Sequence, residues 1–141
     1  MQRNKVQDAR NKKIKNTKMT EMKQKEKRFD LEERTLEYSK RVLRLCKSLP
    51  KNDMNREMAD QLFRSASAVG ANYREANDSL GKKDFVMRIK ISRKEAKEAE
   101  YWLDLVAEGN PGMKEKMSDL IKETKELRMI FSSIANKVLT N

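Results

Sequence analysis

Four lysines recur at helical spacing in the middle of this sequence and are its strongest candidates for binding chemistry: Lys83, Lys90, Lys94 and Lys97. On a helix these positions share one face, and Met87 falls between them. A line of positive charges along a helix can follow the phosphates of a nucleic acid. The surrounding residues 82–94 hold six basic residues and one acidic residue, a net charge of +5.

The candidate nucleic-acid contacts are the basic residues of this ridge and its flanks: Lys82, Lys83, Arg88, Lys90, Arg93, Lys94 and Lys97. The alternative is an ordinary solvated helix face balanced by Glu95 and Glu98, and the spacing alone favours neither. Phe85 and Trp102 fall on the expected core side. Stacking of unpaired bases on aromatic rings is therefore not supported.

The residue types that most catalytic sites need are absent. The chain contains no histidine, which excludes Glu-x-x-His di-iron sites, histidine acid–base chemistry and serine or cysteine triads. Cys46 is the only cysteine, so there is no intramolecular disulfide and no zinc-ligand pair, and we interpret it as a small buried hydrophobe. Glu95, Glu98 and Glu100 lie among basic residues and are expected to form solvated ion pairs. We expect no enzyme activity, no cofactor and no metal site.

The composition favours long amphipathic helices in one domain. Of the 141 residues, 37% are hydrophobic and 39% charged, with four glycines and two prolines. The sequence contains no run of about 18 apolar residues, the length that a membrane-spanning helix needs. The N-terminus lacks the apolar segment of a secretory signal, and a single cysteine suits a reducing compartment, so a cytoplasmic location is expected.

The basic excess is concentrated at the N-terminus. Residues 1–28 hold eleven Lys/Arg and three Asp/Glu, a net charge of +8 out of +11. We therefore expect a basic tail at 1–28, helical or disordered, and a helical domain at 29–141. Such a tail binds polyanions by releasing their counterions. The alternative is a solvated extension without a role.

Apolar residues spaced three and four apart predict helices near 30–49, 53–80, 82–108 and 112–139, and no strands. Because the connections are short, successive helices should be antiparallel, which gives an up-down-up-down four-helix bundle.

Local signals set the expected details of these helices. Asp30 can cap the first helix with Glu33 in a capping box, and Gly81 can end the second. The apolar stripe of the second helix runs from Met54 to Leu80. Gly70, inside that stripe, predicts close approach of a neighbouring helix.

Three segments resemble one known family. They are 61–76 (QLFRSASAVGANYREA), 82–105 (KKDFVMRIKISRKEAKEAEYWLDL) and the opening 29–42 (FDLEERTLEYSKRV). They are similar to the second-helix, third-helix and opening segments of bacterial four-helix-bundle proteins, also called S23 or 23S rRNA intervening-sequence proteins. The resemblance covers about residues 29–138 and leaves 1–28 without a counterpart.

The resemblance implies more about architecture than about activity. Family members are antiparallel four-helix bundles, some form homopentameric rings, and some are encoded inside intervening sequences of 23S rRNA genes. A related branch, the accessory variability protein of diversity-generating retroelements, works with a reverse transcriptase and RNA. The family's polar motif positions are matched here, beyond the basic residues already named, by Arg64, Asn72, Glu75, Glu95 and Glu98. These residues are candidates for a shared role or for polar pairing at a core or subunit interface.

Two functional hypotheses follow. The first is a non-enzymatic, homopentameric protein that associates with RNA or another nucleic acid through the candidate contacts, with the tail adding affinity. The alternative is a protein-interaction scaffold that docks a partner enzyme such as a reverse transcriptase, with nucleic-acid contact incidental.

Overall fold

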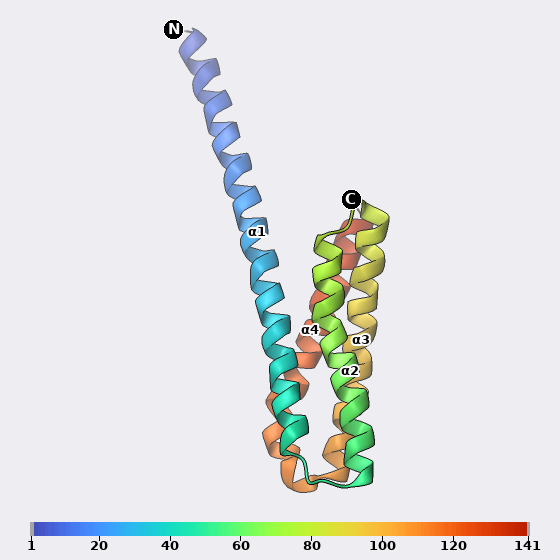
Figure 1. Ribbon diagram of the computed structural model, residues 1–141. Coiled ribbons are helices and arrows are strands. Elements are labelled where there is room, and N and C mark those ends of the chain that lie inside the picture. Colours follow the sequence, from blue (N-terminus) through green and yellow to red (C-terminus); the bar gives the residue numbers. More distant parts are fainter. Residues whose placement is uncertain (1, 141) are drawn as a thin grey trace. The chain divides into compact units, whose positions relative to one another are not determined.

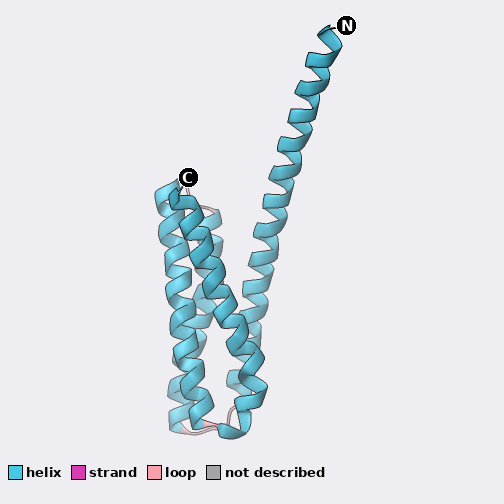
Figure 2. Ribbon diagram, turned by 180° about the vertical axis from the view of Figure 1, so that it is seen from behind, coloured by secondary structure: helices cyan, strands magenta, loops and turns pink. Residues whose placement is uncertain are grey.

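The computed structural model describes the backbone of residues 2–140 and the side chains of residues 4–23 and 30–140. These described residues are helical with short connections and contain no strand (Figures 1 and 2). The prediction of an all-α protein is confirmed. The elements are α1 (Gln2–Ser48), α2 (Asp53–Asn77), α3 (Lys82–Gly109), a 3-10 turn η1 (Pro111–Met113) and α4 (Lys114–Thr140).

The chain divides into two compact units, residues 1–31 and 32–141, where we expected a division between 28 and 29. The ends of both expected segments, Met1 and Asn141, lie outside the described residues. In the first unit the side chains of residues 4–23 are exposed. This part of α1 has basic side chains all round and no apolar face to bury, so core packing does not explain its sequence.

α1 begins much earlier than predicted. The expected start at Asp30, closed by Glu33, is wrong, because both residues lie inside α1. No glycine or proline occurs between residues 2 and 49, so nothing in the sequence interrupts the helical hydrogen bonds before residue 30. The end is as expected, since α1 stops two residues before Pro50.

α2 begins where predicted and ends early. Asn52 caps it by accepting a hydrogen bond from the Asn55 amide at 2.8 Å. The prediction that Gly81 ends this helix is wrong. The amides of Asp78 and Ser79 bond back to the carbonyls of Glu75 and Ala76, which closes α2 at Asn77. Gly81 instead stands before α3 with an extended backbone.

The core of the second unit takes a stripe of buried side chains from each helix. The largest apolar residues of this core are Tyr38, Val42, Leu62, Val69, Ile89, Leu103, Val106, Met117, Leu127 and Phe131. Both ends of the expected α2 stripe are wrong, since Met54 and Leu80 are 71% and 104% exposed. Asn55 is buried in place of Met54, because the true face of α2 is shifted by one residue at its first turn.

Residues 32–48 of α1 pack closely against α2. A Cβ placed on Gly70 would lie 2.9 Å from Oγ1 and 3.1 Å from Cβ of Thr35. The close approach predicted at Gly70 is therefore confirmed. The Ser39 hydroxyl lies 3.5 Å from the Ala66 carbonyl, and Asn77 Nδ2 donates to Glu32 at 3.0 Å.

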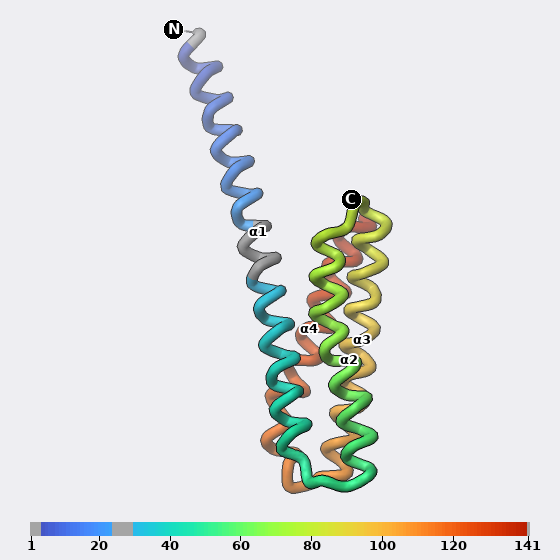
Figure 3. The backbone as a smooth tube through the Cα atoms, viewed as in Figure 1, coloured from blue at the N-terminus to red at the C-terminus, as the bar shows by residue number. Residues whose placement is uncertain are grey.

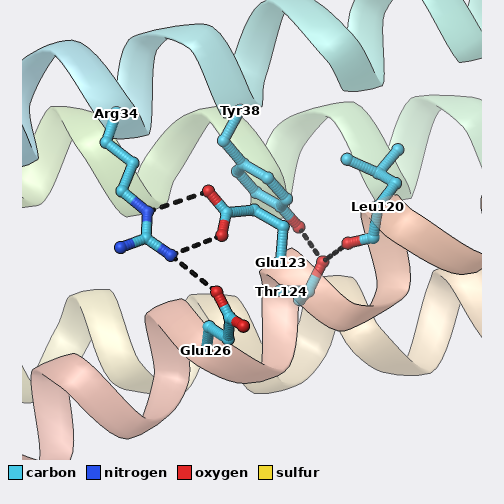
Figure 4. Close-up of polar contacts among 6 residues, drawn as sticks. All are labelled: Arg34, Tyr38, Leu120, Glu123, Thr124 and Glu126. Carbon is cyan, nitrogen blue, oxygen red and sulfur yellow. Dashed lines mark hydrogen bonds and ion pairs between the residues drawn. The ribbon is translucent and has the colours of Figure 1, made fainter.

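Polar contacts join the same part of α1 to α4 (Figure 4). The Arg34 guanidinium donates to the Glu123 carboxylate at 2.9 and 2.6 Å and to Glu126 at 2.8 Å. The hydrogen bonds to Glu123 raise the pKa of Arg34. One turn further on, the buried Tyr38 hydroxyl lies 2.7 Å from Thr124 Oγ1. Because the Thr124 hydroxyl donates to a backbone carbonyl, the proton of this bond comes from Tyr38.

A buried amide pair links two connections at one end of the second unit. Asn55 Nδ2 donates to Asn110 Oδ1 at 3.0 Å, and Asn110 Nδ2 donates to Asn55 Oδ1 at 2.9 Å. Asn55 also bonds to the Pro50 carbonyl, and Asn110 to the Val106 carbonyl. The connection before α2 is thereby held to the connection after α3. We did not predict this pair, because two asparagines beside turns do not reveal that they meet.

Candidate nucleic-acid interface

α3 is positioned by its contacts with α2 and α4. Its buried stripe includes Ile89, Ser92 and Ala96, and the Ser92 hydroxyl donates to the Val69 carbonyl of α2 at 2.9 Å. Burying that stripe turns other positions of α3 outward. All four ridge lysines, Lys83, Lys90, Lys94 and Lys97, are exposed.

The flanking residues extend this surface toward α4. The exposed Lys82 and the half-buried Arg93 lie on the side of the ridge that faces Leu139, near the end of α4. Figure 3 shows the start of α3 beside the end of α4. A groove of about 910 Å³ lies here, lined by Lys82, Lys83, Val86, Met87, Lys90, Ile91, Arg93, Lys94 and Leu139. The spacing of lysines around Met87 predicted a basic surface on α3, but nothing in the local sequence predicted that Leu139 of α4 lies beside it.

Arg88 lies apart from the other candidates. It falls about 140° around α3 from Lys83, on the side toward α2, and is half-buried. Its Nη1 donates to Asn72 Oδ1 at 3.2 Å, and Asn72 Nδ2 donates to the Ala68 carbonyl at 2.9 Å. Two polar residues of the resembled segments therefore pair with each other across α2 and α3.

The charges of α3 oppose its helix dipole. Lys82 and Lys83 occupy the first turn, where Asp84 is the acidic residue present. Residues 82–94 carry +5 and residues 95–109 carry −4, with no basic residue in the last turn. Since the first turn carries partial positive charge and the last turn partial negative charge, this order costs stability. At the start of α3 the dipole adds to the lysines, and the combined field attracts an anion.

The remaining polar motif residues are exposed or interact within their own helix. Arg64 pairs with Asp60 at 3.3 Å in the exposed i, i+4 arrangement, and Glu75 is exposed. Desolvation, followed by the charge of Glu98, raises the pKa of Glu95. The Glu98 carboxylate accepts a hydrogen bond from Trp102 Nε1 at 3.4 Å. These four motif residues do not converge on one site.

The third carboxylate named in the sequence, Glu100, is not solvated as expected. Its Oε2 is buried and lies 3.3 Å from the buried Nε of Arg128 on α4. This distance makes an ion pair, although the geometry is not that of a hydrogen bond. Across the described residues no cluster of three or more cysteine or acidic side chains is arranged to hold a metal ion.

Cys46 is half-buried, not fully buried as expected. Its Sγ lies 3.7 Å from the Ala59 carbonyl. Burial raises the pKa of the Cys46 thiol to about 11. At neutral pH the side chain is therefore a thiol, which is a poor nucleophile and a poor metal ligand.

The sequence matches the profile of a known family. The family profile of the 23S rRNA-intervening sequence protein matches residues 27–133. The chain belongs to this family. The match confirms the resemblance seen in the sequence, and it contains all of α2 and α3 together with residues 32–48 of α1. Most of the basic tail lies before the matched region.

A solved structure of the S23 family has a similar fold. It is the crystal structure of a protein of unknown function from the S23 ribosomal protein family of Bacteroides thetaiotaomicron. The TM-score is 0.68 at 29% sequence identity, and the alignment covers 77% of this chain and 97% of that one. No curated protein matches the sequence. In the described part of this S23 family member, no helix has the length and apolarity to cross a membrane.

Proposed function

We propose that this S23 family member is a non-enzymatic, oligomeric protein that associates with RNA through the exposed ridge of α3. The observation that carries the proposal is the placement of Lys83, Lys90, Lys94 and Lys97 together on the solvent side of one helix. Within the described residues none of the four forms an ion pair or a side-chain hydrogen bond. They remain available to neutralise phosphates.

The charge order of α3 supports the same conclusion. A sequence selected only for stability would place acidic residues at the start of the helix and basic residues at its end. This chain does the reverse, and residues that act against stability are typical of functional surfaces. The exposed basic side chains within residues 4–23 add charge that attracts any polyanion, with no sequence preference.

We further propose an up-down-up-down four-helix arrangement in a homopentameric ring. Support comes from the apolar side chains that the second unit leaves exposed. Met54, Tyr101 and Leu105 are 71%, 59% and 37% exposed, and they lie where α2 begins and α3 ends. Met54, Met58, Trp102 and Leu105 line a groove of about 670 Å³ there. Burying such a surface against a neighbouring subunit removes it from water.

The alternative is a scaffold that docks a partner enzyme such as a reverse transcriptase. The apolar residues that line the groove favour it, because phosphates need the lysines but gain nothing from Met87 or Ile91. On this alternative, substitutions of the lysines would leave RNA binding by the purified protein unchanged.

A matched pair of variants tests the proposal. One replaces Lys83, Lys90, Lys94 and Lys97 with glutamine, and the other replaces Lys12, Lys13, Lys15 and Lys18 in the first unit. Both remove four positive charges, and glutamine has nearly the helix propensity of lysine. Fluorescence anisotropy with a labelled RNA should show a larger loss of affinity for the ridge variant. Equal losses would show that the ridge contributes no more than its net charge. A loss confined to the first-unit variant would show that the ridge does not bind RNA.

A further inference from the structure

The groove between α3 and α4 combines features that RNA alone does not require. Four of its lining residues are apolar and are called the floor here: Val86, Met87, Ile91 and Leu139. The other five are basic and are called the rim: Lys82, Lys83, Lys90, Arg93 and Lys94. No acidic residue lines the groove. Met87 and Leu139 are 48% and 55% exposed, so apolar surface is open to solvent along a strongly basic strip. No aromatic residue lines the groove, and bases therefore have no ring on which to stack.

We propose that this groove docks an acidic amphipathic helix of a partner protein. The floor residues would contact the apolar face of such a helix, and the rim residues would pair with its carboxylates. Methionine suits this role because its flexible side chain adapts to the shape of what it contacts. The proposal does not rest on RNA binding, although both ligands would use the rim lysines.

The dimensions of the groove set the size of the occupant. The rim extends from Lys82 to Lys94, about 18 Å along α3 at 1.5 Å per residue. A helix of about three to four turns covers that length and presents apolar residues at i, i+3 or i+4, and i+7. Because the occupant contacts Lys83, Lys90 and Lys94, it excludes RNA from the same part of the ridge.

Two peptides of identical composition test the proposal on the full chain. The first is a labelled peptide of about 14 residues, with leucines along one face of a helix and glutamates elsewhere. The second has the same leucines spread around the helix. Anisotropy should show roughly tenfold tighter binding of the first peptide. Equal binding of the two peptides would mean that charge alone is recognised, which would overturn the proposal.

Single substitutions separate the floor from the rim. Met87→Gln should weaken binding of the first peptide several-fold and leave RNA binding unchanged. Met129→Gln, at an exposed methionine of α4 outside the groove, is the matched control and should change neither. Replacing Lys90 and Lys94 with glutamine should weaken the binding of both the peptide and RNA. Circular dichroism confirms that each variant is folded.

Two outcomes would contradict the groove as a peptide site. In the first, Met87→Gln binds the peptide as tightly as Met129→Gln does. In the second, Met87→Gln weakens RNA binding and leaves peptide binding unchanged, which would make the groove a nucleic-acid surface. If the full chain binds the first peptide but no RNA, the proposed RNA function fails while the docking groove stands.

Discussion

At Gly70 the backbone of α2 comes so close to α1 that no side chain fits between them. Replacement by alanine brings a Cβ to 2.9 Å from Thr35 Oγ1, an atom of a β-branched side chain that cannot turn away freely. Alanine gains about 1 kcal/mol of helix propensity, but overpacking costs about 1–3 kcal/mol. We expect Gly70→Ala to lower the free energy of unfolding, measured by urea denaturation.

A double-mutant cycle with Thr35→Ala identifies the cause. Removing the Thr35 hydroxyl gives the new methyl group part of the room that it needs, so Gly70→Ala should cost less in that background. If the cost is the same in both backgrounds, the contact with Thr35 is not what requires glycine.

Cys46 provides a pH test of a single site. Because burial raises the pKa of its thiol to about 11, the reactive thiolate is scarce at neutral pH. The rate of alkylation by iodoacetamide should rise with pH up to an inflection near pH 11. In the unfolded chain the same thiol loses its proton around its ordinary pKa of 9.0, so stability should fall as the pH rises from 9. A rate that levels off by pH 9 would show an ordinary, solvated thiol.

At the scale of the element, α3 has a charge order that opposes its dipole. Lys82→Glu together with Lys83→Glu places negative charge in the first turn. Each substitution should raise the free energy of unfolding by about 0.3–1 kcal/mol, and both should weaken RNA binding. Lys97→Glu is the control for stability alone, because Lys97 is exposed but far from the start of the helix. As a ridge lysine, Lys97 should also weaken RNA binding when it is replaced.

Urea denaturation measures the stability of these variants, and fluorescence anisotropy measures their affinity for RNA. A gain in stability with a loss of RNA affinity supports a surface kept for binding at the expense of stability. Unchanged RNA affinity in the double variant would mean that the start of α3 does not contact RNA.

The sequence predicts the helices and their buried faces well and their ends less well. The spacing of apolar residues and the turn residues between them predict α2, α3 and α4. A helix that buries one face needs apolar residues every three or four positions, whichever helices it packs against. The capping box at Asp30 fails, since a cap needs an interruption in the chain and none precedes it. Gly81 fails because amides at Asp78 and Ser79 end α2 sooner.

The candidate surface divides in the same way. The spacing of lysines on α3 predicts the ridge, because that spacing is a local property of one helix. The groove beside it requires Leu139, more than forty residues later in the chain, and no local pattern reveals which helices meet. The pairing of Arg88 with Asn72 also depends on how α2 and α3 pack.

At the scale of the whole molecule, we expect an oligomer. Light scattering of the full chain at micromolar concentration should give about five times 16.6 kDa. Leu105→Gln should lower that mass, because Leu105 belongs to the exposed apolar surface where α2 begins and α3 ends. Leu36→Gln is the matched control, since Leu36 has the same 37% exposure and lies on α1. A parent mass of 16.6 kDa would contradict the ring.

The salt dependence of RNA binding shows whether the α3 ridge neutralises phosphates. For a single-stranded RNA, each neutralised phosphate contributes about −0.7 to the slope of log affinity against log salt concentration. Replacing Lys83, Lys90, Lys94 and Lys97 with glutamine should reduce the magnitude of that slope by about 2–3. We expect a shallower slope and weaker binding at every salt concentration for this variant. A slope equal to that of the parent would show that the α3 ridge neutralises no phosphates and would contradict the account.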